Sequence, residues 1–513
     1  MTTFTPVSCS LADLVGANVT EAACQARAFL TGADLGALQK LATERIEFWP
    51  AAHQRRLREL LPRAGQTVTG ALAGSAGGAG TRMVQSATKL PMAPVSGLGY
   101  FRVGADGRLY VISKSEHYHA PLGHNFPGYA LIDRARALGI PNATHNNTRG
   151  PITRRLEEEL VRVANGLSPT ADLQPILNST APDVLNRVLN LETGSLAAEA
   201  AFKLALARFY RHEPTGPAPT YHGRVPVFLV LGGDDGALTG NYHGTTITTQ
   251  MLRGLWPELQ MRLEAAGTLR VCAVRPNSIE DLTAAFRQYE QPPFKIAAFF
   301  HEIIMMNYGA RRLSEEFLQQ AHRLCAEHDV PTIVDEIQSC MWYEGLFLFQ
   351  HYGLKPTMVV LGKGFPGGEY PASRILFNAR YDLLPQFGAL VTNGQEELAS
   401  LAYLITMKWT QANGAAITAV GRCLETGFRQ IAREFPNAVT GIEGQGHLLG
   451  LRFPDLVRGR AFVSAMNQMG FDISVQAYKA DCPPVALTKL PTIADTALIE
   501  FTLEQMRQAL RQV

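Results

Sequence analysis

The sequence predicts an α/β fold with a mostly parallel central sheet, and two observations lead to this prediction. Five short, continuously apolar runs are typical of strands that are buried on both faces. The segments between them, such as 278–289 and 314–329, have the apolar periodicity of the helices that usually connect parallel strands. The five apolar runs span residues 225–233, 269–276, 295–303, 330–337 and 358–363.

Helices are predicted before this sheet. Thr20 can cap a helix that Gly32 ends, and the periodicity of 33–49 predicts a second helix. Pro50 can open a third helix, because proline is favoured at the first helical position. The Gly-, Ala-, Ser- and Thr-rich segment 64–80 is typical of a linker, with a small-residue helix-packing segment as the alternative.

The region after the sheet is also partly helical. Residues 397–435 are expected to form one long helix, and the chain is expected to end in a helix over 502–512. Division of the 513 residues by about 150 per domain predicts roughly three structural units.

Composition excludes several classes of protein. The chain has 47 Lys+Arg and 45 Asp+Glu, and this near-neutral balance argues against nucleic acid as the main partner. It has no apolar run of about 18 residues, so we expect no membrane span, and no N-terminal signal peptide pattern. Seven widely spaced cysteines without a Cys-x-x-Cys pair indicate a reducing, cytoplasmic compartment and no metal site.

Lys363 and Asp335 stand at the ends of two predicted strands, where ligands of α/β sheets bind. A lysine in that place is partly desolvated, which lowers its pKa and frees the amine to attack a carbonyl. A carboxylate nearby can hold a protonated ring nitrogen, and the glycines in 364–368 leave room for a bulky ligand. Together these features favour pyridoxal phosphate, bound as a Schiff base; singly, they are also typical of a surface lysine and a helix cap.

Two further motifs fit such a cofactor. Gly194 and Ser195 open an Ala-rich helix, whose N-terminal amides and dipole can hold a phosphate. Tyr242, on the glycine-flanked loop 240–246, can stack on a planar ring. His243 beside it can act as a base, although an isolated histidine is more often structural.

In this order, these motifs resemble the class III aminotransferases of the fold type I pyridoxal-phosphate enzymes. The resemblance covers about residues 100–510 and is carried by GSLAAEAAFKLA, NYHG, HE, IVDEIQS and LGKGFPGGEYPAS. It is extended upstream by DGRLYV and PLGHNFPGY, and downstream by GQGHLLGLRF. It implies a large cofactor domain over 166–395, a small domain from 96–165 and 396–513, and a helical extension with linker over 1–95.

The resemblance also implies residue roles. Lys363 would form the Schiff base and move the substrate proton, and Asp335 would pair with the pyridine nitrogen. Gln338 would bond the phenolic oxygen of the cofactor, and Thr392 would reach the phosphate of a neighbouring subunit, which implies a homodimer. The other residues implied at the cofactor are Gly194, Ser195, Tyr242, His243 and Glu302.

The sequence departs from the family where substrate carboxylates are usually bound. Asn307 stands at the place of a glutamate, and Thr488, next to Lys489, at the place of its arginine partner. We therefore expect a non-standard, aromatic or cyclic carbonyl acceptor. A wider apolar pocket is expected from Met305, Met306, Trp342 and Tyr343. The alternative is that these residues are core packing and that Lys489 or Arg149 binds the carboxylate.

The predicted activity is an aminotransferase that moves an amino group from an amino-acid donor, for example glutamate, to a carbonyl acceptor by ping-pong half-reactions. An aminomutase, an epimerase or a decarboxylating transaminase would share Lys363 and Asp335, so these remain alternatives. A non-catalytic protein of the same fold is the last alternative. A requirement for a separate acceptor would argue against a mutase and an epimerase.

Overall fold

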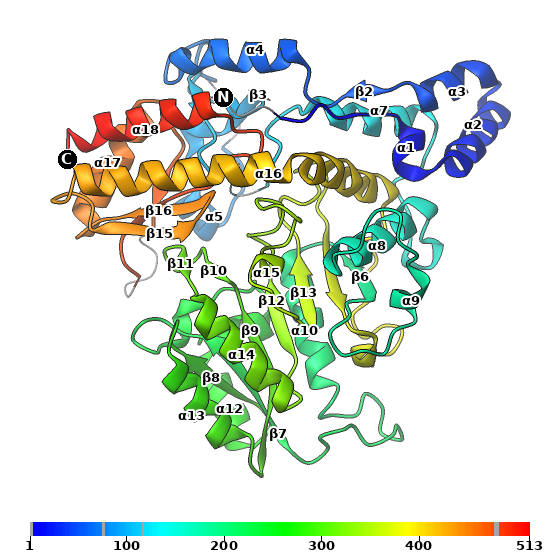
Figure 1. The fold of residues 1–513 in the computed structure, drawn as a ribbon, viewed down its shortest axis with the longest axis vertical. Helices are drawn as coiled ribbons and strands as arrows, with labels where there is room; N and C mark the ends of the chain where they lie inside the picture. The colour runs from blue at the N-terminus through cyan, green and yellow to red at the C-terminus, as the bar shows by residue number, and fades with distance from the viewer. Residues whose placement is uncertain (1–3, 74–76, 115–116, 118, 477–481) are drawn as a thin grey trace.

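The computed structural model describes residues 4–73, 77–114, 117, 119–476 and 482–513. Its centre is a seven-stranded sheet in the order β6-β14-β13-β12-β9-β7-β8. All neighbouring strands pair in parallel except β14, which runs antiparallel to both of its neighbours (Figure 1). The strands are β6 (Arg187–Leu191), β7 (Val225–Leu231), β8 (Arg270–Val274), β9 (Phe294–His301), β12 (Thr332–Asp335), β13 (Met358–Leu361) and β14 (Ser373–Phe377).

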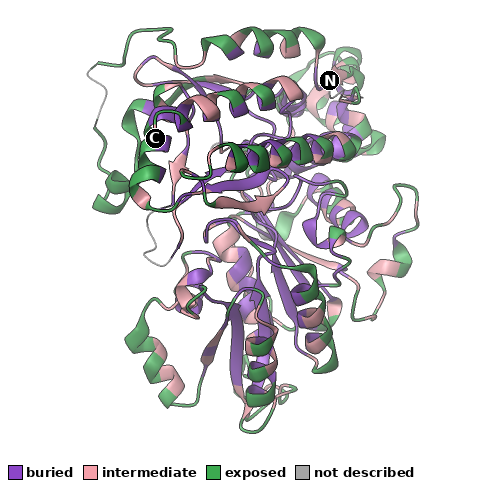
Figure 2. Cartoon of the chain, turned by 60° about the vertical axis from the view of Figure 1, so that its left-hand side comes forward, coloured by how far each residue is buried: buried purple, intermediate pink, exposed green. Residues whose placement is uncertain are grey.

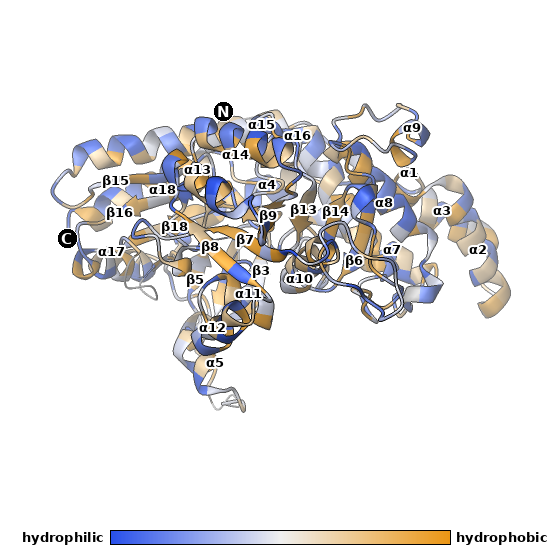
Figure 3. Ribbon diagram, turned by 90° about the horizontal axis from the view of Figure 1, so that it is seen from below, coloured by the Kyte–Doolittle hydropathy of each residue, from blue (hydrophilic) through white to orange (hydrophobic). Residues whose placement is uncertain are grey.

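Both faces of this sheet are buried. On β9, Phe299 packs against Phe317 of α14 (Glu315–Glu327) on one face, with ring centroids 6.5 Å apart. The next residue, Phe300, belongs to the apolar cluster of α10 (Gly194–Leu206) on the other face. Figure 2 shows the strands as a buried layer between more exposed helices, and Figure 3 shows their apolar character. The α/β prediction and its mostly parallel sheet are therefore confirmed.

The remaining elements of the large sheet region connect or cover its strands. They are α8 (Pro151–Ala164), α9 (Gln174–Leu177), α11 (Ile247–Leu252), α12 (Pro257–Ala265), α13 (Ile279–Tyr289), β10 (Ile304–Met305), β11 (Arg311–Arg312) and α15 (Leu348–His351). The long predicted helix is α16 (Glu397–Glu434), which crosses the molecule above this sheet (Figure 1).

Beyond α16 lies a four-stranded antiparallel sheet in the order β15-β16-β18-β17. A second sheet of three strands, β3-β4-β5, is joined to this region because the amide of Val111 donates to the carbonyl of Gly470 (2.7 Å). The elements are β15 (Gly441–Gln445), β16 (Leu448–Arg452), α17 (Leu456–Gln468), β17 (Ser474–Val475), β18 (Val485–Thr488), α18 (Thr496–Leu510), β3 (Pro94–Leu98), β4 (Phe101–Gly104), β5 (Leu109–Val111) and α7 (Ala130–Ala137). The last helix thus begins six residues before its predicted start.

The N-terminal extension is only partly as predicted. Its first long helix begins at Ala17, and Thr20 lies inside it, donating to the carbonyl of Gly16 (3.2 Å) rather than capping. Gly32 ends this helix with φ +71°, as expected. The helix predicted over 33–49 stops at Thr43, because the chain then pairs as a strand with the N-terminal segment. The elements are β1 (Ser8–Cys9), α1 (Leu11–Val15), α2 (Ala17–Thr31), α3 (Leu35–Thr43), β2 (Ile46–Glu47) and α4 (Ala51–Leu60).

The segment predicted as a linker is partly paired. The amides of Gly65, Val68 and Leu72 donate to carbonyls of Leu109, Gly107 and Ala105, each at 2.8 Å. Its first half therefore runs beside β5, and a short helix, α5 (Arg82–Ala87), follows its end. Residues 74–76 of this segment lie outside the described ranges.

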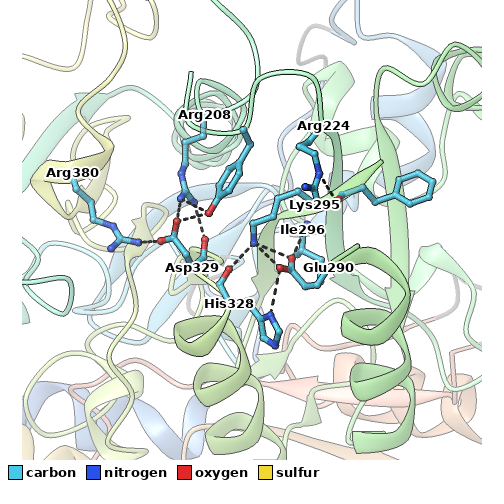
Figure 4. Close-up of polar contacts among 10 residues, drawn as sticks. Arg208, Arg224, Glu290, Lys295, Ile296, His328, Asp329 and Arg380 are labelled. Atoms are coloured by element: carbon cyan, nitrogen blue, oxygen red, sulfur yellow. Dashed lines mark hydrogen bonds and ion pairs between the residues drawn. The ribbon is translucent and has the colours of Figure 1, made fainter. Parts of the chain in front are cut away.

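The amino edge of the central sheet carries a network of ion pairs (Figure 4). Asp329, just before β12, is bonded by Arg208 and Arg380, and accepts from the hydroxyl of Tyr221 at 2.6 Å. Lys295, at the start of β9, donates to both carboxylate oxygens of Glu290 at 2.9 Å. These contacts fasten the segments before and after the strands to one another.

Among the described residues, no helix combines the length and the apolar character that crossing a bilayer requires. The same residues contain no group of three or more His, Cys, Asp and Glu side chains placed to hold a metal ion.

Candidate active site

The carboxyl ends of β9, β12 and β13 are neighbours, and each is followed by an ionisable side chain. Glu302, Asp335 and Lys363 therefore lie along one edge of the sheet. Lys363 has φ +49°, a left-handed conformation that is uncommon for residues other than glycine. Such strained residues cluster at functional sites, because the surrounding structure must hold them in place.

Lys363 is half-buried, and burial lowers the pKa of its amine. The carboxylates of Glu302 and Asp335 act in the opposite direction, because a nearby negative charge favours the ammonium form. Burial is the larger effect, so more of the amine is neutral and nucleophilic near pH 7 than for a lysine in water. This agrees with the desolvation expected for a lysine that closes an apolar strand.

Asp335 is buried and is oriented by two donors. Nδ1 of His243 lies 2.8 Å from its Oδ2, and the amide of Ile337 donates to its Oδ1 at 3.0 Å. His243 packs on Phe300, with ring centroids 4.1 Å apart. The structure thus brings together a carboxylate and a histidine that are 92 residues apart in the sequence.

Glu302, Gln338 and Lys489 form a second buried group. Nε2 of Gln338 donates to the carboxylate of Glu302 at 3.4 Å, and Nζ of Lys489 donates to the main-chain carbonyl of Gln338. The Lys489 ammonium also lies over the ring of Trp342, 3.6 Å from its centroid, in cation–π geometry. Burial holds the pKa of Lys489 well below its usual range.

The N-terminus of α10 forms a small cup. Thr193 caps the helix through the amide of Leu196, so Gly194 and Ser195 present the first turn. The amide of Thr245 donates to the hydroxyl of Ser195 at 3.1 Å, which joins the cup to the loop that carries Tyr242. Main-chain amides, hydroxyls and the positive end of a helix dipole are suited to a phosphate.

The residues fit a planar, phosphate-bearing cofactor. A Cβ built on Gly194 would lie 2.5 Å from Cδ1 of Ile337, so only glycine lets the helix start approach the residue after Asp335 and Glu336. Nε2 of His243 and Oε1 of Gln338 are buried without a protein partner in the described chain, as expected for atoms beside a bound polar group. A carboxylate, a nucleophilic amine and an anion cup on one edge form the donor set that pyridoxal phosphate requires.

Two predicted cofactor residues lie less centrally. Tyr242 is half-buried, and the guanidinium of Arg253 lies 5.0 Å from its ring centroid. Thr392 is exposed on the loop before α16. Their stacking and phosphate-binding roles remain predictions.

Most of the predicted substrate residues are engaged within the protein. Thr488 is buried in β18 and donates to the carbonyl of Leu449 (3.4 Å), and Tyr343 donates to the carbonyl of Gln445 (3.1 Å). Asn307 lies half-buried between β10 and β11, after the buried Met305 and Met306. The indole of Trp342 donates to the carbonyl of Leu490 at 2.9 Å, and Arg149 pairs with Glu157 at 3.2 Å.

The His- and Lys-containing segment 113–120 passes close to the same edge. Lys363 and Lys489 both contribute to a lowered pKa of His119, although burial is the main cause. The carbonyl of His119 would lie 3.1 Å from a Cβ on Gly368, in the loop after Lys363. Ser115, Glu116 and Tyr118 of this segment lie outside the described residues.

The sequence interpretation did not single out Ile337 and Phe300. Ile337 faces the start of α10, and Phe300 supports His243. The signal for Ile337 was present in IVDEIQS, because a buried apolar residue two positions after a buried aspartate points to the same edge. Phe300 lies in a continuous apolar run that gives no sign of its contact with His243.

Comparisons with known proteins agree with this arrangement. The family model described as aminotransferase class-III matches residues 85–510. Among solved structures, the ornithine aminotransferase of Toxoplasma gondii ME49 is similar at a TM-score of 0.64 and 20% identity, covering 83% of this chain and 91% of that chain. An acetylornithine aminotransferase from Elizabethkingia anophelis gives 0.63 and 18%, with coverage of 83% and 95%.

A transaminase from the marine bacterium Virgibacillus gives a TM-score of 0.64 at 15% identity, with coverage of 85% of this chain and 96% of that chain. Another structure of the Toxoplasma enzyme contains pyridoxal phosphate at partial occupancy in its active site. At these identities the solved structures show a shared fold, and the family model covers most of the chain. The protein therefore belongs to the class III aminotransferases, which are pyridoxal-phosphate-dependent transaminases.

Proposed function

We propose that this enzyme transfers an amino group from an amino-acid donor, such as glutamate, to a carbonyl acceptor in two half-reactions, with Lys363 as the reacting lysine. The proposal is carried by one observation: a half-buried amine follows β13 on the same edge as the carboxylates of Glu302 and Asp335. Pyridoxal phosphate, when bound, supplies a carbonyl that condenses with amines and a ring that accepts electrons.

The side chains would divide the work as follows. Nζ of Lys363 attacks the cofactor carbonyl with release of water, and after displacement by the donor amine it takes up and returns the substrate proton. Asp335, held by His243 and the amide of Ile337, would face the ring nitrogen and keep it protonated. The first turn of α10, at Gly194 and Ser195, would hold the phosphate.

We further propose that the acceptor is a non-standard, aromatic or cyclic carbonyl compound rather than a short α-keto acid. The proposal is supported by the engagement of both residues at the usual carboxylate position. Thr488 is bonded within its sheet, and Lys489 has no exposed surface and is held by Gln338 and Trp342. A carboxylate would have to displace these contacts before it could bind there.

The same resemblance supports a homodimer with active sites at the subunit interface. Thr392 is exposed on the loop before α16, as expected of a residue that reaches a neighbouring subunit. Its effect should be tested by comparing cofactor affinity of Thr392→Val with the unmodified dimer. We also propose a cytoplasmic location, since all seven cysteines carry free thiols.

The central experiment is a comparison of Lys363→Ala with Lys355→Ala, a control in which the side chain is 72% exposed. The purified proteins are treated with pyridoxal phosphate and borohydride, and mass spectrometry identifies the modified residue. Lys363→Ala should lose both the fixed cofactor and amino transfer, while Lys355→Ala keeps both. Full activity in Lys363→Ala would contradict the proposal.

The acceptor is tested by kinetics with a panel of keto acids, aldehydes and cyclic ketones. The proposal predicts the highest kcat/KM with a ring-containing or other non-standard carbonyl. A preference for a short α-keto acid in both half-reactions would contradict it. Turnover without any separate acceptor would instead favour a mutase or an epimerase.

A further inference from the structure

We propose that the N-terminal extension, residues 4–63, is part of the active-site scaffold and positions the loop that carries Lys363. The family match begins at residue 85, so this extension lies outside it. The inference rests on the role proposed for Lys363 and adds a source of its position. It follows from a continuous line of contacts that runs from the extension to the glycine-rich loop after Lys363.

The line begins in a group of rings that we name the aromatic cluster. Trp49, at the end of the extension, stacks on Phe126 with centroids 6.2 Å apart and an angle of 25°, and lies 5.7 Å from Trp409 of α16. Phe126 also meets Trp409 at 5.5 Å. The cluster consists of Phe4, Phe48, Trp49, Phe126 and Trp409.

The aromatic cluster holds the chain that follows Phe126. A Cβ on Gly128 would lie 2.9 Å from Cγ of Phe48, so the extension packs directly against this short helical turn, η3 (Pro127–Tyr129). Phe126 lies edge-on to Tyr129, with centroids 5.6 Å apart. The hydroxyl of Tyr129 is bonded to that of Thr406 at 2.7 Å, which fixes the direction of its ring.

Tyr129 in turn occupies the space beside Gly367. A Cβ on Gly367 would lie 1.6 Å from the hydroxyl oxygen of Tyr129 and 2.2 Å from its ring, and the φ of Gly367 is +71°. The amide of Gly367 donates to the carbonyl of Gly364 at 2.7 Å, which closes a turn that starts directly after Lys363. Movement of Tyr129 therefore shifts this turn and, with it, Nζ of Lys363.

The burial of these side chains makes the line rigid. Phe48, Trp49, Phe126, Tyr129 and Trp409 are each at most 6% exposed. Close-packed interiors transmit a displacement, because no side chain has free space into which it can relax. A change of ring size in the extension should therefore be detected at Lys363.

The test compares Trp49→Ala with Leu38→Ala. Leu38 lies in α3 with similar burial, 9% exposed against 6% for Trp49, but outside the aromatic cluster. Two properties are measured on the full-length enzyme with cofactor: the rate of cofactor release, and the pH at which the absorbance of the lysine-linked cofactor changes. Both report on Lys363 without substrate.

Trp49→Ala should release the cofactor about tenfold faster and shift the absorbance titration, while Leu38→Ala stays within about twofold of the parent. Trp49→Phe should restore most of the parent values. Equal behaviour of Trp49→Ala and Leu38→Ala would overturn the inference. If Lys363→Ala retains a fixed cofactor, the proposed function itself fails, so the two failures are distinguishable.

A second pair of variants keeps the inference testable if Trp49→Ala does not fold. Gly367→Ala should speed cofactor release, because its methyl overlaps Tyr129. Combined with Tyr129→Ala, which removes the overlapping ring, it should recover part of the loss. An effect of Gly367→Ala that Tyr129→Ala leaves unchanged would mean that Tyr129 does not position the loop, and the inference would be abandoned.

Discussion

Two aspartates at opposite ends of one strand are held in different ways. Asp329, just before β12, is bonded by two arginines and a tyrosine, and these contacts keep its pKa low although burial opposes them. Asp335, at the end of β12, is more deeply buried and is held by a histidine and a main-chain amide. The first carboxylate is matched by protein cations, and the second retains capacity for a positively charged ligand.

The difference indicates a division between the two edges of the central sheet. At the amino edge, Lys295 pairs with Glu290 and Asp329 with Arg208, so that charge serves to fasten strands and loops. At the carboxyl edge, a strained lysine follows its strand and side chains serve a cofactor. Substitutions at the two edges should therefore act on different properties, which the following predictions test.

The largest effect is expected for Asp335→Asn. It keeps the shape of the side chain but removes the charge opposite the cofactor ring, so kcat of each half-reaction should fall by a factor on the order of a hundred to a thousand. Stopped-flow absorbance measures the half-reactions, and thermal unfolding of the cofactor-free protein should change little. A kcat within tenfold of the parent would remove the catalytic side of the comparison.

The next effect is expected for Lys295→Met at the amino edge. The substitution leaves Glu290 buried without its partner, which should lower the free energy of unfolding by about 3 kcal/mol. Cofactor release should not change. Denaturant unfolding of Lys295→Met and of Lys295→Met/Glu290→Gln checks this, since the double variant should be the more stable of the two. Altered cofactor release in Lys295→Met would mean that the two edges are not separate.

A smaller, pH-dependent effect is expected at Glu336, which is fully buried beside Asp335. Burial raises the pKa of Glu336 to about 7 from 4.5, so the folded protein keeps a proton that the unfolded chain has lost. Stability should therefore fall as pH rises between these values, by about 2 kcal/mol from pH 5 to pH 8. Glu336→Gln should reduce this decrease in unfolding measurements, and an unchanged pH dependence would contradict the assignment.

The smallest effect is expected for Arg380→Gln. Arg380 and Asp329 are both partly exposed, at 38% and 43%, and solvent weakens such pairs. The free energy of unfolding should fall by less than about 1 kcal/mol. High salt should reduce the difference further, which equilibrium unfolding at two salt concentrations can measure. A loss as large as that of Lys295→Met would show that exposure does not decide the strength of these pairs.

The sequence predicted five of the seven strands because these five are continuously apolar. It did not predict β6 and β14, since each has a polar residue in its middle. Asn190 of β6 is bonded to Glu157 and Gln395, and Arg374 of β14 to carbonyls of Leu191 and Ser373. Both side chains are buried by tertiary partners that no local pattern shows.

The candidate site was partly predictable for a similar reason. Lys363 and Asp335 follow recognisable strands, and the order of motifs supplied Gln338, Glu302 and the phosphate cup. The bond between His243 and Asp335 joins residues 92 positions apart, and nothing in the spacing predicts it. Substrate residues were the least predictable, because their roles depend on which polar groups the protein itself already uses.

The antiparallel strand β14 has a consequence for how this site forms. Leu361 of β13 pairs with Arg374 of β14, so the segment with Lys363 is a short loop closed by adjacent strands. Closing a short loop costs little chain entropy, whereas the contact of His243 with Asp335 must close a long one. During folding, the reacting lysine should therefore acquire its surroundings before the aspartate does, and pulsed hydrogen exchange should protect the amides of β13 and β14 ahead of the loop around His243.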